Sequence, residues 1–346
     1  MQPIKWILLF FSLFNSLLSV AQPIHPADYG LKSFTLRDKK LGKISFYLDT
    51  ININKKAPLF LDVNGSGGYP LCFLIKGKGY ERVMNTFKPF HISQTQVQYH
   101  YILLDKPGTP FCDTIYTDQG KDAFNGTTLL ESYRPSPAYT QQMSLEWRIN
   151  ASKAVLNYLV SKNYWDRSQM IAFGYSEGAQ VVPALAVAEK KISHVAAVVG
   201  SGLNQFYDEI LQFRINAAIG KMTHPQAQDS IESKMKEIEA IYRDPANTTR
   251  EYRGHSFQRW ASFGSSIPFE ELRKLDIPIY VVASSNDRNS PIYSLDYLWL
   301  DFIRLGKTNL TYKTCVDCNH SLISGKDDKA LSNYSDYFMA ILKWIK

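Results

Sequence analysis

The chain has 346 residues and a formal charge of +7, and 45% of its residues are hydrophobic. This composition excludes an intrinsically disordered chain, because the apolar residues suffice for one large core or two modest ones. The basic excess is spread along the sequence, and short clusters such as residues 37–40 are typical of solvated loops. We therefore expect a folded protein that binds no nucleic acid.

The first 21 residues have the pattern of a secretory signal peptide. Lys5 precedes an apolar run at 6–18, and small residues at 19–21 form a cleavage site before Gln22. The run is short for a membrane span, which disfavours an uncleaved anchor, and no cysteine follows the site to accept a lipid. We expect a secreted or periplasmic protein whose domain spans 22–346, without stable membrane insertion after cleavage.

Four cysteines remain in the exported chain, where an oxidising environment favours disulfides. We favour pairing Cys72 with Cys112, since both follow neighbouring predicted strands in loops, and Cys315 with Cys318, since they are close in sequence. Zinc binding by Cys315, Cys318 and His320 is the alternative. It lacks a second ligand pair with the spacing of a structural zinc site.

The elements that follow predict an α/β protein. Two alternating segments, 32–36 and 43–48, predict a leading antiparallel hairpin. Short continuous apolar runs then predict parallel strands that are covered on both faces. These runs are residues 59–63, 101–104, 170–173, 194–199 and 279–283. Helical spacing over 144–162 and between other strands predicts a mostly parallel central sheet flanked by helices.

Residues 203–272, called the insertion below, contain no convincing strand and two predicted helices at 206–220 and 225–243. Because this segment lies between two predicted strands of the sheet, we interpret it as a helical lid over the carboxyl end of the sheet. An ordinary helical elaboration without a gating role is the alternative.

The pentapeptide GYSEG at 174–178 lies between the strand at 170–173 and a small, apolar stretch at 179–188. A serine in a sharp strand-to-helix turn is exposed above the sheet, and the flanking glycines let the backbone pack closely. The pattern predicts Ser176 as a nucleophile. The pentapeptide alone is weak evidence, because glycine and serine also make ordinary turns.

A nucleophilic serine needs a base and an acid that orients the base. Asp287 follows the strand at 279–283, and His320 follows an alternating strand at 310–314. Both would therefore emerge at strand ends. The aspartates 208, 296, 301 and 317 are weaker candidates, because they lie in the insertion, in a predicted helix or too close to His320.

The order Ser176, Asp287, His320 and its strand contexts resemble the α/β-hydrolase family from about residue 31 to the C-terminus. The resemblance implies an α/β-hydrolase fold with a helical lid insertion and a catalytic triad of these three residues. Pro183 departs from the common pattern, because it falls inside the helix after the serine and removes one of its amide bonds.

A glycine-rich loop at 62–69 also follows a strand. It is similar to the family's oxyanion loop, with Asn64 in place of a histidine. The resemblance implies that the backbone N–H groups of Ser66 and Glu177 bind the oxyanion. The side chain of Glu177 would either brace these loops or contact a polar or cationic substrate group. The loop lacks both nucleotide-binding patterns, so we expect no cofactor, and no metal is needed.

These features favour a secreted serine hydrolase that cleaves a carboxylic ester through an acyl-enzyme intermediate. The partner would be a small-molecule ester. A peptidase or amidase on the same triad, acting on a short peptide, is one alternative. A noncatalytic binding protein of the same fold is the second. The sequence leaves the oligomeric state open.

Overall fold

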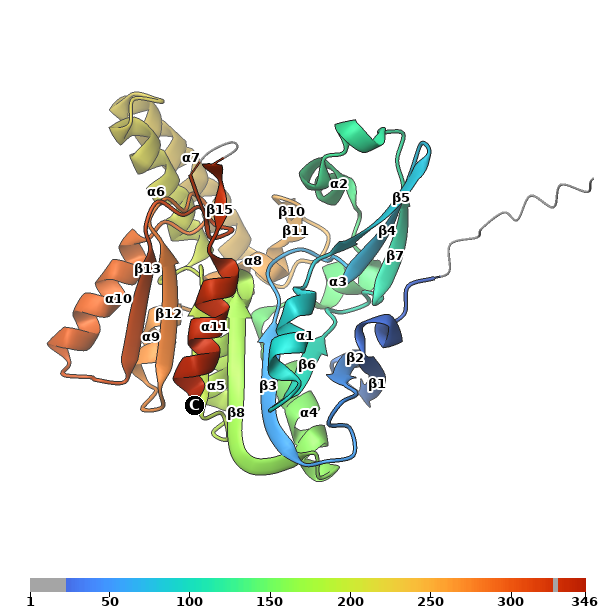
Figure 1. Cartoon of the computed structure of the whole chain (residues 1–346). Helices are drawn as coiled ribbons and strands as arrows, with labels where there is room; N and C mark the ends of the chain where they lie inside the picture. The colour runs from blue at the N-terminus through green and yellow to red at the C-terminus, as the bar shows by residue number, and fades with distance from the viewer. Residues whose placement is uncertain (1–22, 326–328) are drawn as a thin grey trace, which may run out of the picture.

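The computed structural model describes residues 23–325 and 329–346 (Figure 1). The predicted signal peptide lies outside the described residues. The central sheet has eight strands in the order β1-β2-β6-β3-β8-β9-β12-β13. They are β1 (Leu31–Asp38), β2 (Gly42–Asp49), β3 (Ala57–Val63), β6 (His100–Leu104), β8 (Trp165–Tyr175), β9 (His194–Val198), β12 (Ile279–Ser284) and β13 (Leu310–Cys315).

The central sheet is mostly parallel, as the sequence predicts. Strand β2 is antiparallel to β1 and to β6, whereas β6, β3, β8, β9, β12 and β13 run parallel to one another. The leading hairpin is therefore confirmed, and each predicted parallel strand lies in this sheet. Because all the parallel strands end at the same edge, the loops after β3, β8, β12 and β13 meet there.

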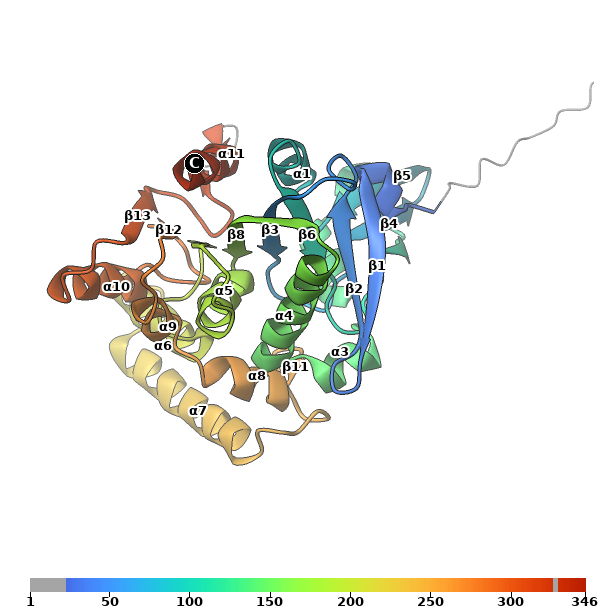
Figure 2. The same ribbon diagram turned by 90° about the horizontal axis from the view of Figure 1, so that it is seen from below.

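Helices cover both faces of the sheet (Figure 2). Helices α1 (Pro89–Thr95) and α11 (Tyr334–Ile345) lie on one face. Helices α4 (Leu145–Ser161), α5 (Glu177–Ala188), α9 (Pro268–Arg273) and α10 (Tyr293–Arg304) lie on the other. Successive side chains of a strand point to opposite faces of the sheet, so the protein has one hydrophobic core on each face. Within β3, Leu59 and Leu61 pack under α4 and α5, while Phe60 packs under α11.

Part of the insertion forms a separate small core, and its C-terminal part, with Phe269 and Leu272, packs into the main core. The insertion contains α6 (Gln205–Ala218), α7 (His224–Arg243), α8 (Phe257–Gly264) and α9, of which only the first two were predicted. The expectation of no strand is wrong, because β10 (Glu251–Tyr252) pairs with β11 (His255–Ser256). Two-residue strands are too short to show alternation in sequence. Phe206, Ile241 and Trp260 are among the residues that join α6, α7 and α8.

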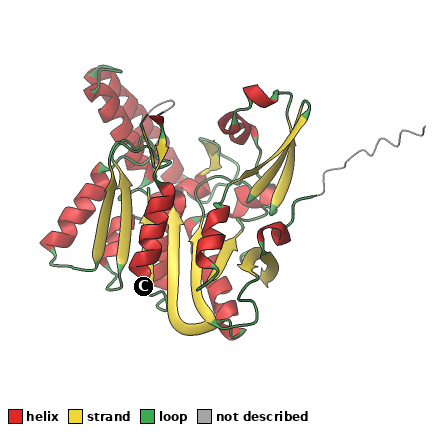
Figure 3. Cartoon of the chain, in the orientation of Figure 1, coloured by secondary structure: helices red, strands yellow, loops and turns green. Residues whose placement is uncertain are grey.

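A second, three-stranded sheet lies beside the central one and was not predicted (Figure 3). It consists of β4 (Cys72–Gly77), β5 (Tyr80–Asn85) and β7 (Cys112–Tyr116). Cys72 and Cys112 thus lie in paired strands, opposite each other, and not in loops. Both are free thiols, so the predicted disulfide between them is wrong; the Cys112 thiol contacts the carbonyl oxygen of Asp113 at 3.7 Å.

The other elements are short. They are η1 (Pro26–Tyr29), η2 (Lys121–Ala123), α2 (Gly126–Ser132), α3 (Pro137–Gln142), β14 (Ile323–Ser324) and β15 (Leu331–Ser332). Among the described helices, none combines the length and the apolar character that a membrane crossing needs.

Candidate active site

Ser176 occupies a strained turn between β8 and α5. Its backbone has φ 56° and ψ −119°, a conformation that a residue with a side chain rarely adopts. The turn requires both glycines, because a Cβ on Gly174 would lie 2.2 Å from the Gly178 oxygen, and one on Gly178 would lie 1.9 Å from the Val63 oxygen. The strand-to-helix context expected from the pentapeptide is confirmed, and α5 continues past Pro183.

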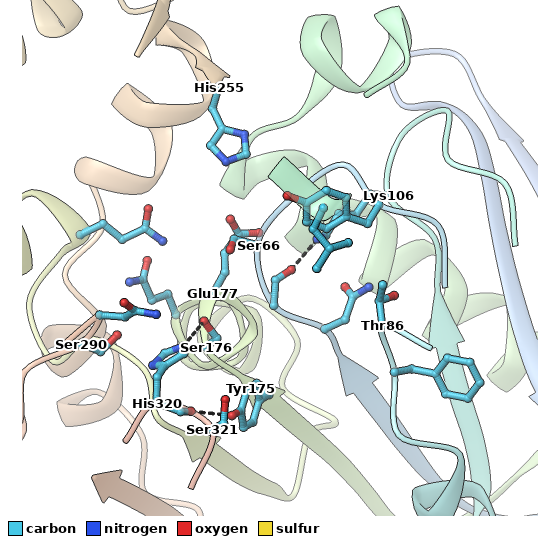
Figure 4. A pocket seen from close by; sticks show the side chains of 18 of the residues that line it. Ser66, Thr86, Lys106, Tyr175, Ser176, Glu177, His255, Ser290, His320 and Ser321 are labelled. Atoms are coloured by element: carbon cyan, nitrogen blue, oxygen red, sulfur yellow. Dashed lines mark hydrogen bonds between the residues drawn. The ribbon is translucent and has the colours of Figure 1, made fainter. Parts of the chain in front are cut away.

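The structure brings Ser176, His320 and Asp287 into one hydrogen-bonded chain. Figure 4 shows the contact between Ser176 and His320. The Oγ of Ser176 lies 2.9 Å from Nε2 of His320, and Nδ1 of His320 lies 2.7 Å from Oδ2 of Asp287. With the proton on Nδ1 donated to Asp287, Nε2 is free to accept the hydroxyl proton of Ser176. The three residues come from the loops after β8, β13 and β12.

Asp287 is held by its own loop. Its Oδ1 accepts hydrogen bonds from the amides of Asn289 at 2.7 Å and Ser290 at 2.9 Å, and the carboxylate is buried. The second oxygen is thereby left to His320. Asp287 therefore stabilises its turn with one carboxylate oxygen and orients His320 with the other.

The loop of His320 is fixed by a disulfide and by Tyr175. Cys315 and Cys318 form the predicted disulfide, which uses both thiols and excludes the zinc alternative. Among the described residues, no cluster of histidine, cysteine or acidic side chains could hold a metal ion. The hydroxyl of Tyr175, the residue before Ser176, donates to the backbone oxygen of His320 at 2.6 Å.

The glycine-rich loop after β3 packs directly on Ser176. A Cβ placed on Gly65 would lie 3.3 Å from Cβ of Ser176, so there is little room for a side chain between the loop and the serine. Glu177 is the first residue of α5, and its N–H has no acceptor inside the helix. Among the described residues, neither the amide of Ser66 nor that of Glu177 donates to another protein group.

The side chain of Glu177 lies in a buried ion cluster. Its Oε1 accepts from Nη1 of Arg148 at 3.1 Å, and its Oε2 accepts from Nη2 of Arg259. Burial alone would raise the pKa of Glu177, but Arg259, Lys106 and Arg148 outweigh it and lower the pKa to about 2. The bracing role considered for this side chain is confirmed: it joins α4, α5 and α8.

The same cations hold the carbonyl groups of the glycine-rich loop. Arg148 donates through Nη2 to the backbone oxygen of Asn64 at 2.9 Å and to its side-chain oxygen at 3.1 Å. Lys106 donates through Nζ to the backbone oxygens of Gly65 and Gly67. Burial, with Arg148 nearby, lowers the pKa of Lys106 to about 7. The carbonyl groups of this loop are therefore turned toward buried cations.

A cavity of about 670 Å³ opens above Ser176. In Figure 4, Thr86, His255 and Ser290 surround the serine from three sides. The insertion contributes Gln205, Asp208, Glu209 and Gln212 from α6, Arg253 and His255 from the β10–β11 hairpin, and Arg259 and Trp260 from α8. The hydroxyl of Tyr139 lies 3.3 Å from Nδ1 of His255.

Sequence reasoning missed Lys106, Arg148 and Arg259. For Arg148 a signal was present: it lies three, four and seven residues before Ala151, Ser152 and Val155 on the buried face of α4. Lys106 and Arg259 had no comparable signal. Lys106 comes shortly after an apolar strand, and Arg259 lies next to apolar residues. Exposed lysines and arginines are found in the same sequence contexts.

The strand order, the antiparallel second strand and the serine between β8 and α5 together define an α/β-hydrolase fold. Solved structures share it. DcsB, solved in complex with its substrate analogue, is 13% identical, with a TM-score of 0.53 and coverage of 91% of this chain and 98% of that chain. The α/β hydrolase GrgF from Penicillium sp. is 10% identical, with a TM-score of 0.51 and coverage of 91% and 96%.

A puromycin-hydrolyzing peptidase from Mycobacterium tuberculosis is also similar in structure. It is 14% identical, with a TM-score of 0.51, and the alignment covers 84% of this chain and 36% of that chain. This chain thus spans about a third of the length of that peptidase. No family model matches the sequence. No curated protein matches it.

Proposed function

We propose that the protein is an exported serine hydrolase that cleaves a carboxylic ester, with Ser176, His320 and Asp287 as its catalytic triad. The observation that carries the proposal is the hydrogen-bonded chain of these three side chains at the floor of an open cavity. A serine hydroxyl becomes a nucleophile at neutral pH when a positioned imidazole accepts its proton.

In the reaction, Oγ of Ser176 attacks the carbonyl carbon while its proton moves to Nε2 of His320. Asp287 keeps the imidazole oriented and stabilises its positive form. The tetrahedral intermediate collapses, the alcohol leaves with the proton from His320, and the acyl group stays on Ser176. Water then attacks the acyl-enzyme with His320 as the base, which releases the acid and restores the serine.

The developing oxyanion would bind to the amides of Ser66 and Glu177. Two features support this role: both amides lack a protein acceptor among the described residues, and the loop of Ser66 packs on Ser176. The positive end of α5 adds to the stabilisation of negative charge at this place.

We also propose that the insertion acts as a lid. Its helices α6 and α8 supply a large part of the cavity wall, and α6, α7 and α8 share a core of their own. Export through the segment at 1–21 is likewise a proposal, supported by the sequence pattern of that segment.

Hydrolysis assays test the esterase proposal. The purified protein is assayed with p-nitrophenyl acetate and with aminoacyl and peptidyl p-nitroanilides. We expect ester hydrolysis that falls by at least about 10⁴-fold in Ser176→Ala. The control Ser168→Ala replaces an exposed serine of the same strand and should retain activity. Faster cleavage of the anilides would favour a peptidase, and no turnover with intact folding would favour a binding protein.

A further inference from the structure

Most of the residues that line the cavity above Ser176 have polar side chains. The described residues among them also include the apolar side chains of Met84, Phe87, Leu130 and Trp260 and the tyrosines at 69, 175 and 334. A ligand bound here would therefore meet hydrogen-bonding groups together with aromatic rings.

Three carboxamides of the lining accept a hydrogen bond through the side-chain oxygen. The side-chain oxygen of Asn85 accepts from Tyr29 at 2.7 Å, that of Gln205 accepts from Arg259 at 2.6 Å, and that of Asn64 accepts from Arg148. None of the three NH₂ groups donates to another described residue. Because their acceptor sides are occupied, these carboxamides act toward a ligand as donors.

Most of the carboxylate oxygens of the lining accept hydrogen bonds. Glu177 pairs with Arg148 and Arg259, and Glu209 accepts from Tyr252 and from Arg253, the latter at 3.2 Å. Asp62 accepts from His91 at 2.7 Å and from Tyr101, both through its Oδ2.

Asp208 accepts from Ser201 at 3.1 Å, and burial raises its pKa well above the ordinary value. The Asp208 carboxyl is itself buried, which disfavours its charged form.

We propose that the substrate is an ester of an oxygen-rich alcohol, such as an acylated sugar or polyol, and that Asn85 and Gln205 bind its oxygen atoms. The proposal rests on the proposed esterase function and names its substrate class. An ester of a polyol offers many acceptors, which matches the free NH₂ donors of these carboxamides.

A peptide fits these three carboxamides less well. Its backbone carries one N–H donor for each carbonyl acceptor. The side-chain oxygens of the three carboxamides cannot accept from these N–H groups without losing the bonds from Arg148, Tyr29 and Arg259. An ester rich in acceptors is therefore the better match to them.

Two matched esters test the proposal. Methyl xyloside triacetate and cyclohexyl acetate share an acetyl group on a six-membered ring, but only the first carries additional ester oxygens. We expect kcat/KM to be at least tenfold higher for the xyloside acetate in the wild-type protein. p-Nitrophenyl octanoate and alanyl p-nitroanilide, as a lipid-like ester and an aminoacyl amide, should be poorer substrates.

Two isosteric variants test the residues. Asn85→Asp and Gln205→Glu keep the oxygens that accept from Tyr29 and Arg259 but remove the NH₂ donors. Each should lower the ratio of kcat/KM for the xyloside acetate to that for cyclohexyl acetate by about tenfold. Asn216→Asp, which adds the same charge on α6 outside the cavity lining, should leave the ratio unchanged.

Equal or higher kcat/KM for cyclohexyl acetate, for the octanoate or for the anilide in the wild-type protein would overturn the proposal. An unchanged ratio in both isosteric variants would also overturn it. If Ser176-dependent turnover of an ester is still faster than that of the anilide, the esterase function itself stands; a faster anilide would favour a peptidase. If a fluorophosphonate left Ser176 unlabelled in the folded protein, the proposed esterase function would be contradicted. The proposed substrate class would then be contradicted too, because it rests on that function.

Discussion

Glu177 and Arg259 form a buried ion pair that joins the residue after Ser176 to helix α8 of the insertion, 82 residues further along the chain. Arg148 binds the other oxygen of the same carboxylate and also holds Asn64 of the glycine-rich loop. The serine turn, the glycine-rich loop and the insertion are therefore connected through one carboxylate. Breaking this connection should affect stability in a way that depends on pH.

Glu177→Gln should destabilise the protein at pH 7. It leaves Arg148 and Arg259 without a negative partner in a buried site, and removing one member of such a pair costs about 3–5 kcal/mol. Urea unfolding followed by circular dichroism measures the loss. Glu239→Gln removes an exposed carboxylate that pairs with Arg243, and it should cost under about 1 kcal/mol.

The wild-type protein should also lose stability in acid through Glu177. Its folded pKa of about 2 lies below the ordinary value of 4.5, so the stabilisation is fully present above pH 4.5 and is lost as the pH falls toward 2. The loss amounts to about 3 kcal/mol. Unfolding free energies measured from pH 7 to pH 2 should show a smaller loss in Glu177→Gln. Parallel curves for the two proteins would contradict a lowered pKa.

Lys106→Met should slow the reaction by about 10- to 100-fold in kcat with a smaller change in KM. The variant removes the donor that holds the carbonyl oxygens of Gly65 and Gly67, which should loosen the amide of Ser66. The affinity for a trifluoromethyl ketone, which forms a tetrahedral adduct, should fall in parallel with kcat/KM. Lys78→Met, in an exposed turn, is the control. A change in KM alone would indicate a substrate contact instead.

Asp287→Asn should lower kcat by roughly 10³- to 10⁴-fold while the protein stays folded. The amide can still face the N–H groups of Asn289 and Ser290 through its oxygen, but its NH₂ group cannot accept the proton of His320 Nδ1. Steady-state kinetics with p-nitrophenyl acetate gives the size of the effect. Activity near the wild-type level would mean that another acid orients His320.

Gly178→Ala should reduce the amount of folded protein and abolish turnover. Its Cβ would overlap the backbone oxygen of Val63, which cannot move away without shifting β3. Gly120→Ala is the matched control, because a Cβ there meets nothing within 4 Å and its φ of −70° suits any residue. Thermal unfolding of both variants compares them, and equal midpoints would show that the turn tolerates a side chain.

Chain order and strand contexts predicted the sheet, the serine turn and its two partners because those features are local. Apolar runs mark β3 and β12 whatever lies around them, and loops after parallel strands must meet at one edge. Residues 72–75 form a continuous apolar run in β4, but the three-stranded sheet was missed because the partner strand β5 is largely exposed and lacks such a run. The ion cluster was missed because Glu177 and Arg259 are far apart in sequence, and charged side chains are usually exposed.

The most direct test of the account is covalent labelling of Ser176. The folded wild-type protein is treated with a fluorophosphonate, digested and analysed by mass spectrometry, with His320→Ala and Ser176→Ala in parallel. We predict a stoichiometric adduct on Ser176 in the wild-type protein, labelling that is slower by about 10³-fold or more in His320→Ala, and none in Ser176→Ala. A folded wild-type protein without an adduct on Ser176, or with equal labelling in His320→Ala, would contradict the proposed triad.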